Sequence, residues 1–552
     1  MAAERSLLRS AGIVGLMTLL SRLSGLAQTF FLSHVLGAGA AADAYAVAFR
    51  LPNLLRRFTA EGTMTAAFLP TLAEVEAKEG EAAMKATAAR FLGTLTALLA
   101  ILVALAILLM GVIAGLLVVG RLTPPGSGFG ASFHMLGEVL AGRVAAPPEM
   151  ALTVRLGRIM FPYLVLVSLT AGFAGVLNLR HRFGLPASVS IFWNLAYIGF
   201  AAAALAFFKA RGQAGADTAA LCCALAVLAG GVVQLALLWP AARSLGFGFR
   251  FGLHLKDPGV VRALRRMGPG LLAAGIYPIN ALVSTMLASN LSDGAQIVLY
   301  NSGMMGEMVL GVFAMSLATA SLPLMARQAE AQDLDGLRGS LSDGLRASAL
   351  LCIPASVGLA VLALPVARLL FQTGRYGADA AAWTATTMMF QMTGLLFVAG
   401  SRIGTQALYA LKDYRGPVKV AFASLGANIV LSILLLKPLG TGGLALANGL
   451  SSVVGLALLG RLLHRRLGQL PVAAVAKGWG ESLLGAALMG GLAYLGARAL
   501  ALDGPLLSRK LLALKLFPLI AACGLAYFGL MLAMGNAQAK QLGAKLRQKL
   551  GR

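Results

Sequence analysis

Residues 90–120, RFLGTLTALLAILVALAILLMGVIAGLLVVG, begin with one arginine and carry no further charge. An apolar run of about 20 residues is long enough to cross, as a helix, a hydrocarbon core of about 30 Å. Runs of this kind recur along the whole chain of 552 residues, whereas the ten-residue alternating strands of an outer-membrane barrel do not. The sequence therefore predicts an all-α polytopic membrane protein.

The bulk composition agrees with this class. Hydrophobic residues form 58% of the chain and charged residues 12%, and the mean hydropathy is +0.81, which is outside the range of soluble globular proteins. A formal net charge of +25 would suggest nucleic acid binding in a soluble protein. Here the basic residues concentrate in alternate loops, as cytoplasmic loops of membrane proteins require. We therefore expect membrane lipids, and no nucleic acid, as partners.

About 14 transmembrane helices are predicted. An even number places both termini on one side, and the basic tail with Lys540 and Lys545 predicts that this side is cytoplasmic. Residues 1–36 lack a cleavage pattern, so the first span is expected to act as an uncleaved insertion signal. The predicted spans cover residues 8–36, 41–72, 90–120, 155–179, 185–208, 217–240, 268–291, 295–326, 347–372, 383–411, 417–437, 441–464, 478–501 and 511–534.

A weak internal repeat divides the chain. GVLNLRHRFGLP (175–186) aligns without gaps with QALYALKDYRGP (406–417), and each is followed by a helix that is expected to bury an asparagine, Asn194 or Asn428. Repeated halves are usual in secondary transporters, with the substrate site between them near the membrane midplane. Short basic turns with proline are also generic in membrane proteins, so the repeat alone does not establish that the chain consists of two repeated halves.

The repeat predicts two pseudo-symmetric six-helix lobes plus two C-terminal helices. The N-terminal lobe covers residues 1–242, a cytoplasmic connector covers 243–266, and the C-terminal lobe covers 267–466. Residues 467–552 hold the last two helices and the basic tail. The loop 121–149, rich in proline and glycine, is predicted to be an external excursion without recognisable chemistry.

Charged residues interrupt the second span. The stretch AGAAADAYAVAFRLPNLLRRFTAEGTMTAAFLP (38–70) contains Asp43, Arg50, Arg56, Arg57 and Glu61. An ionisable residue at membrane depth costs about 3 kcal/mol or more, so it normally faces a wet cavity, a partner or a ligand. The spacing of seven between Asp43, Arg50 and Arg57 is nearly one helix face, but Pro52 is predicted to break the helix between them.

Arginine is in excess across the charged spans. The first span adds Arg22 and Gln28, and the C-terminal lobe adds Arg402 and one central acid, Glu307. A cavity with surplus arginine would bind an anion, and the planar guanidinium suits phosphate oxygens in particular. Two other interpretations stay open: Asp43 and Glu61 pair with the arginines to lock helices together, or Arg22 and Arg50 snorkel to the interface.

No motif of an enzyme competes with this interpretation. The five histidines are scattered, and the chain lacks a zinc-protease, nucleophile-elbow or Walker motif. We expect no metal and no cofactor, so that transport would be coupled to an ion gradient, the membrane potential or the substrate gradient. Cysteines 222, 223, 352 and 523 lie in apolar segments without metal-ligand spacing and are expected to be small core residues.

Two stretches resemble a known family. SRLSGLAQTFFLSHVLGAGAAADAYAVAFRLPNLLRRFTAEGTMTAAFLPTLAE (21–74) and FPYLVLVSLTAGFAGVLNLRHRFGLPASVSIFWN (161–194) are similar to the MurJ/MviN family of lipid II flippases, with LPNLLRRFTAEG as the most specific signature. The resemblance implies the fold of the multidrug/oligosaccharidyl-lipid/polysaccharide exporter superfamily: two six-helix lobes in a V, with helices 13 and 14 adding a groove for a lipid tail.

The resemblance also implies an activity. It would be the export of lipid II, undecaprenyl diphosphate carrying the disaccharide pentapeptide precursor of peptidoglycan, from the inner to the outer leaflet of the bacterial cytoplasmic membrane by alternating access. Carried over by motif, the substrate-binding residues would be Arg22, Asp43, Arg56, Arg57, Glu61 and Arg402. Gln28, Arg50 and Glu307 would line the cavity.

The chain departs from the family pattern at two sites. Gln28 and Thr29 stand where the family commonly has an Arg-Asp pair, and Met304 stands where it usually has arginine. The chain could therefore be a divergent lipid II flippase with fewer cavity arginines, or a flippase for another undecaprenyl-diphosphate-linked glycan. A multidrug or ion antiporter of the same superfamily is a further alternative.

Overall fold

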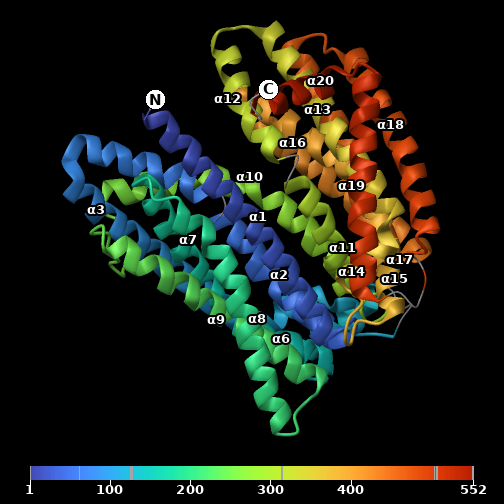
Figure 1. Cartoon of the computed structure of the whole chain (residues 1–552). Coiled ribbons are helices and arrows are strands. Elements are labelled where there is room, and N and C mark those ends of the chain that lie inside the picture. The colour runs from blue at the N-terminus through green and yellow to red at the C-terminus, as the bar shows by residue number, and fades with distance from the viewer. Residues whose placement is uncertain are drawn as a thin grey trace. The chain divides into compact units, whose positions relative to one another are not determined.

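The computed structural model describes residues 2–60, 63–124, 129–311, 315–502, 504 and 508–549. Within these ranges the chain forms twenty α-helices and one 3-10 helix, with no β-structure beyond one isolated bridge (Figure 1). Eight helices of this part are individually long and apolar enough to cross a membrane. The prediction of an all-α polytopic membrane protein is confirmed. Each predicted span overlaps helical residues, while the count of fourteen stays a prediction.

Contacts divide the chain into two compact units. The first unit comprises Met1–Ile297 with Thr373–Tyr376, and the second comprises Val298–Gln372 with Gly377–Arg552. The lobe boundaries drawn from the repeat stay a prediction. Both asparagines that follow the repeat are buried, as expected: Asn194 in the first unit and Asn428 in the second.

The first unit packs around aromatic and aliphatic side chains of its third and seventh helices. Phe68 and Phe91 stack with ring centroids 4.4 Å apart, and Phe173 packs in the same cluster. The helices of this unit are α1 (Ala2–Leu36), α2 (Ala40–Ala60), α3 (Thr63–Leu108), α4 (Met110–Leu117), η1 (Val119–Arg121), α5 (Phe129–Leu140), α6 (Pro148–Met160), α7 (Tyr163–Leu179), α8 (Gly184–Ala210), α9 (Ala216–Arg243), α10 (Pro258–Ala288) and the start of α11 (Ala295–Val309).

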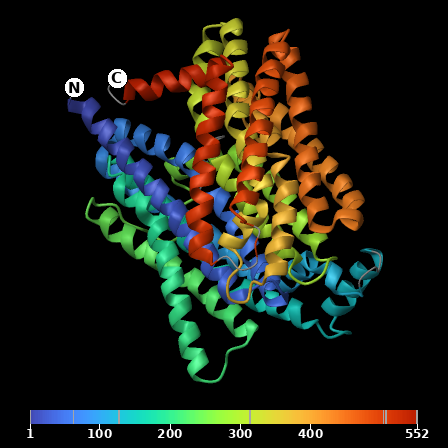
Figure 2. The ribbon, with the colours of Figure 1, turned by 45° about the vertical axis from the view of Figure 1, so that its right-hand side comes forward.

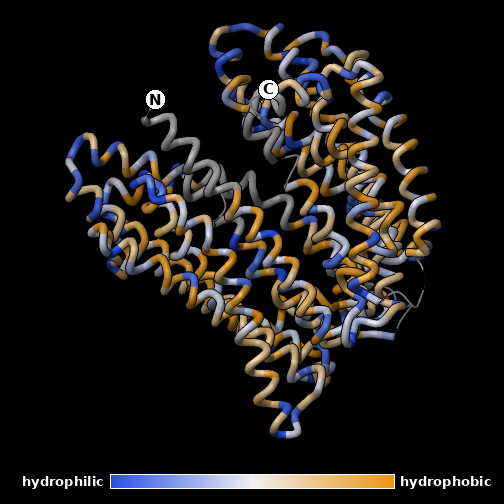
Figure 3. The backbone as a smooth tube through the Cα atoms, viewed as in Figure 1, coloured by the Kyte–Doolittle hydropathy of each residue, from blue (hydrophilic) through white to orange (hydrophobic). Residues whose placement is uncertain are grey.

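Apolar helices and hydrophilic turns alternate in this unit. In Figure 1, α8 and α9 run side by side, and Figure 3 shows the turn that joins them as hydrophilic between two largely apolar helices. All four cysteines of the chain are buried and free, which confirms the expectation that they are core residues.

One prediction about α2 is wrong. The helix is continuous from Ala40 to Ala60 with Pro52 inside it, so proline does not break it. Proline removes one backbone hydrogen bond, but an open break within a membrane would leave several backbone groups unsatisfied, at a cost of several kcal/mol each. Keeping the helix, with one backbone hydrogen bond missing, therefore costs less free energy than breaking it. The helical periodicity therefore continues past Pro52. Asp43 and Arg50, which both precede Pro52 and are seven residues apart, lie on nearly one face of α2.

The second unit also has its own core, in which Leu337, Ile403 and Leu459 are buried together. Two of its C-terminal helices, Val472–Ala499 (α18) and Arg509–Ala533 (α19), lie side by side, both towards the red end of the colour scale (Figure 2). Its helices after α11 are α12 (Met315–Glu330), α13 (Leu334–Val361), α14 (Ala363–Leu370), α15 (Ala378–Met392), α16 (Leu395–Ala410), α17 (Arg415–Leu467), α18 (Val472–Ala499), α19 (Arg509–Ala533) and α20 (Ala537–Lys549).

Helix α17 is two helices joined by a tight reversal at Gly440. Gly440 has φ 54° and ψ −130°, a conformation that only glycine adopts without strain. A Cβ atom on Gly455 would lie 2.6 Å from the Ser424 hydroxyl oxygen. Since residues 424 and 455 are nearly equidistant from Gly440, the two arms must run antiparallel. This reversal lies between the predicted spans 417–437 and 441–464.

The basic loops predicted to be cytoplasmic carry ion pairs with the first part of α3. Glu74 contacts Arg266 at 2.8 Å and Arg262 at 3.2 Å. Arg180, in the turn between α7 and α8, contacts Glu76 at 2.9 Å and Glu81 at 3.0 Å. These contacts join α3 to the connector and to the α7–α8 turn.

Candidate functional site

The best-defined polar site of the first unit is built around Asp43. Helix α1 ends at Leu36, and Gly37 reverses the chain with φ 72°, so α2 can start at Ala40. Asp43 follows in the first turn of α2, and its side chain is only 2% exposed. A carboxylate this deeply buried requires partners for its charge and for its lone pairs.

Arg121 provides the counter-charge. Its Nη2 contacts Oδ2 of Asp43 at 2.5 Å, and its Nη1 contacts Glu149 at 2.7 Å and Asp293 at 2.6 Å. The Arg121 side chain is 9% exposed, whereas the Asp293 side chain is 63% exposed. One buried guanidinium therefore joins an acid at the start of α2, an acid at the start of α6 and an acid between α10 and α11.

The backbone at the start of α11 completes the site. The N–H of Ile297 donates to Oδ1 of Asp43 at 2.7 Å, and the N–H of Gly294 donates to Oδ2 at 2.8 Å. Amide groups at a helix N-terminus have no partner within the helix and carry a partial positive charge, so they favour an anion. Asp43 thus caps α11 from another helix, and its carboxylate is fully engaged.

Neighbouring contacts hold the same elements together. The N–H of Gly120 donates to the Ser289 hydroxyl at 2.9 Å, and the Gln296 side chain donates to the carbonyl oxygens of Leu117 and Thr285. A Cβ atom on Gly120 would lie 2.6 Å from the backbone nitrogen of Asn290. The close approach of η1 to the α10–α11 loop, which positions Arg121, therefore requires glycine at position 120.

Arg22 lies on α1 in a second polar region of this unit. The Asn194 side chain, on α8, donates to the Ser24 hydroxyl at 2.8 Å and weakly to the Ser21 carbonyl at 3.4 Å. These bonds fix α1 against α8 on either side of Arg22. The Arg22 side chain is half-buried, and among the described residues it forms no ion pair. Gln28, two turns further along α1, is also half-buried.

An aromatic cluster supports α2 next to its arginines. The hydroxyls of Tyr45 and Tyr197 lie 3.0 Å apart in the core, and Trp193 packs against Phe49 and Tyr197. Arg50 directly follows Phe49, and its side chain, like that of Arg56, is half-buried. The cluster fixes the rotation of α2 about its axis and so sets which way its polar residues face.

The remaining candidate residues lie elsewhere in the chain. Arg402 is half-buried on α16, and Glu307 is half-buried on α11, both in the second unit. Glu61 and the side chain of Arg57 lie outside the described residues. Within the part of the chain that the structure describes, no group of three or more His, Cys, Asp or Glu side chains could hold a metal ion.

The structure thus pairs Asp43 with Arg121, which the sequence did not suggest. Arg121 lies in the loop 121–149 that was predicted to carry no recognisable chemistry, and its partners are 28, 78 and 172 positions away. The only local signal was an arginine directly after the apolar run 90–120 and an acid, Glu149, at a helix start after proline. Neither indicates which residues meet in the fold.

Comparison with known proteins identifies the family. The family described as "Lipid II flippase MurJ" matches residues 32–508 of this chain. The chain therefore belongs to the lipid II flippase MurJ family. Its "Lipid II flippase MurJ" relative from Burkholderia cenocepacia is 30% identical over 550 residues, covering 96% of this chain and 98% of the relative.

Other relatives agree with this assignment. A "Probable lipid II flippase MurJ" of Vibrio cholerae is 31% identical over 461 residues, covering 84% of this chain and 83% of the relative. A solved structure, "Lipid II flippase MurJ, inward closed conformation", has a TM-score of 0.70 at 18% identity and covers 98% of this chain and 99% of that one. Because the two sequences are only 18% identical, this likeness is evidence for the fold alone.

Proposed function

We propose that this protein moves lipid II from the inner to the outer leaflet of the bacterial cytoplasmic membrane. The observation that carries the proposal is membership of the MurJ family over residues 32–508. The activity is transport and not chemical conversion of the lipid. Both chain termini face the cytoplasm in this proposal, as the basic loops and tail predict.

The arginines of α1 and α2 would hold the diphosphate. Arg22 and Arg56 are half-buried, and a guanidinium donates two parallel hydrogen bonds to phosphate oxygens. Because the Asp43 carboxylate is engaged by Arg121 and by two N–H groups, Asp43 does not need Arg22 or Arg56 for its charge balance. Arg57, Glu61 and Arg402 are further candidates for head-group contacts.

Transport would follow alternating access. Two lobes that rock about a central site expose it to one leaflet at a time, as is general for transporters with repeated halves. The energy would come from the membrane potential, an ion gradient or the lipid gradient. The last two apolar helices, α18 and α19, would hold the prenyl tail, since they have few polar residues along their length.

A second candidate is the export of another undecaprenyl-diphosphate-linked glycan. Gln28 and Met304 stand where the resemblance places arginine in the family, so fewer charges would face the substrate. A multidrug antiporter is disfavoured because it would need cavity acids to exchange an ion for a cationic drug, whereas arginine is in excess across the charged spans.

Complementation tests both the function and the arginines. The gene should restore growth to a bacterium depleted of its own lipid II flippase. Removing one charge-assisted contact costs about 1.5–3 kcal/mol, so Arg22→Ala and Arg56→Ala should lower lipid II flipping by about 10- to 100-fold. The lysine variants keep the charge without the paired donors and should be intermediate.

Arg143→Ala is the matched control, because the exposed Arg143 pairs only with Glu138 in the described structure. It should insert into the membrane and complement like the wild type. If the Arg22 and Arg56 alanine variants insert normally and transport at full rate, the anion site is wrong. If the wild type fails to complement but flips another undecaprenyl-linked glycan, the second candidate replaces lipid II.

A further inference from the structure

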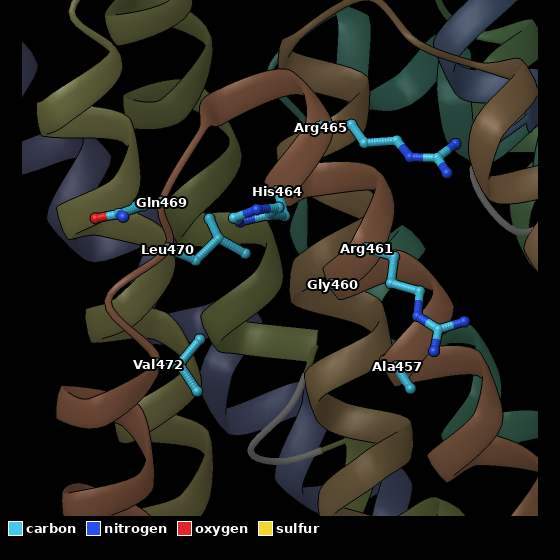
Figure 4. Close-up of a pocket in the computed structure, with 8 residues that line it drawn as sticks. All are labelled: Ala457, Gly460, Arg461, His464, Arg465, Gln469, Leu470 and Val472. Atoms are coloured by element: carbon cyan, nitrogen blue, oxygen red, sulfur yellow. The ribbon is translucent and has the colours of Figure 1, made fainter.

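A basic pocket lies in the second unit, where α17 ends and α18 begins. Its volume is about 500 Å³, and the residues that line it are Ala457, Gly460, Arg461, His464, Arg465, Gln469, Leu470 and Val472 (Figure 4). None of these residues belongs to the candidate site described above. Both helices that form the pocket are long and apolar enough to cross a membrane.

The charge of the pocket comes from two arginines one helical turn apart. Figure 4 shows the side chains of Arg461 and Arg465 extending in the same direction from α17. The neighbouring Arg466 contacts Asp413 at 3.4 Å, whereas within the described part of the chain neither pocket arginine forms an ion pair. The helix dipole favours cations only in the last turn, and Arg461 lies six residues before the end of α17.

An apolar stripe leads along α17 into the pocket. Leu450 and Val454 are 40% and 37% exposed, and with Ala457 they precede Arg461 and Arg465 at intervals of three or four residues. That spacing is one face of a helix. Val472, at the start of α18, is 66% exposed on the other side of the pocket. The surface changes from apolar to cationic along one helix face, as it does where a membrane helix leaves the hydrocarbon core.

We propose that this pocket binds the headgroup of an anionic glycerophospholipid. Arg461 and Arg465 donate hydrogen bonds to the phosphate, and an acyl chain lies on the apolar stripe of Leu450 and Val454. Basic pockets between membrane helices on the cytoplasmic side are suited to anionic lipid headgroups, and arginine binds phosphate through paired donors. Free phosphate would match the arginines but leave the stripe uncovered. The site does not depend on lipid II transport.

Native mass spectrometry of the full chain in detergent tests the proposal with dioleoylphosphatidylglycerol as the probe and dioleoylphosphatidylcholine as its uncharged comparison. The wild type should bind the anionic lipid in preference. Loss of each arginine should weaken this binding about 5-fold, so the double variant Arg461→Gln/Arg465→Gln should lose about 25-fold. The variant Arg498→Gln/Lys510→Gln removes two exposed charges from the other end of α18 and the adjoining start of α19, away from the pocket, and should bind like the wild type.

A second measurement uses the unaltered chain. A photoactivatable phosphatidylglycerol should label the segment 457–472, and excess inorganic phosphate should not displace it. The proposal is overturned if both double variants lose affinity equally, if Arg461→Gln/Arg465→Gln binds like the wild type, or if labelling avoids this segment. Displacement by phosphate would also overturn it, because the headgroup anion alone would then occupy the pocket.

Discussion

At the scale of single residues, Asp43 shows how a membrane protein retains a buried charge. Its side chain is 2% exposed, and all the hydrogen bonds to it in the described structure come from Arg121, Gly294 and Ile297. Two of these donors are backbone groups at the start of α11, which would need a partner in any case. The carboxylate therefore pairs with the charge of Arg121 and also accepts hydrogen bonds from two backbone N–H groups at the start of α11.

Breaking this pair should destabilise the protein strongly. Removing one member of a buried ion pair costs about 3–5 kcal/mol, because the other charge stays buried without compensation. We expect Arg121→Met to lower the free energy of unfolding by this amount and Asp43→Asn by less, since asparagine still accepts a hydrogen bond. Thermal unfolding of the purified protein in detergent measures both effects.

The double variant Asp43→Asn/Arg121→Met should lose less stability than the two single changes added together, because neither buried charge is then left alone. Arg143→Met provides the control at an exposed pair with Glu138, where the expected loss is below about 1 kcal/mol. If Arg121→Met is no more harmful than Arg143→Met, the buried network does not stabilise the fold.

At the scale of elements, glycine decides where helices of this protein reverse. The predicted spans 417–437 and 441–464 leave only three residues between them, and the structure places Gly440 there with φ 54°. Gly443 adds a close approach, since a Cβ atom on it would lie 2.1 Å from the Leu435 carbonyl oxygen. The reversal thus depends on two glycines within four residues.

Gly440→Ala should destabilise the hairpin of α17 by about 1–3 kcal/mol, the usual cost of a side chain in a sparsely populated backbone region. Gly426→Ala in the same helix is the control, because it has helical geometry and nothing within 4 Å of its added Cβ atom. Thermal unfolding should separate the two variants clearly. Equal melting temperatures would show that the reversal tolerates an ordinary residue.

At the scale of the whole molecule, the chain does not divide into its units by sequence order alone. Thr373–Tyr376 belongs to the first unit although its neighbours on both sides belong to the second. The N–H of Arg375 donates to the His34 carbonyl at 3.1 Å, and the Thr373 hydroxyl lies 2.9 Å from Nδ1 of His34. This short segment is fixed to the end of α1.

Alternating access predicts two-sided exposure of the substrate site. Single cysteines at Leu23, next to Arg22, and at Asn53, one helical turn before Arg56, should react with impermeant thiol reagents from either side of the membrane, depending on the conformation that is trapped. The four native cysteines are buried, so background labelling should be low. A cysteine at Lys412, in a predicted cytoplasmic turn, should react from one side only. One-sided labelling of positions 23 and 53 under all conditions would argue against this mechanism.

The sequence by itself determined the class of this protein. Long apolar runs leave a helix as the stable form in a membrane because its backbone groups satisfy one another locally, so the all-α fold and the burial of Asn194 and Asn428 could be predicted. The resemblance to the MurJ/MviN family could also be read from continuous motifs, and the family match confirms it.

The tertiary structure alone decided which charges meet. The pairs of Arg121 with Asp43 and Asp293 join residues 78 and 172 positions apart, and no helical period extends between such distant segments. The continuity of α2 through Pro52 was mispredicted for a related reason: local preference disfavours proline, while the membrane setting penalises an open backbone more. Local physics fixes helices, but the partner of a buried charge depends on the packing of the whole first unit.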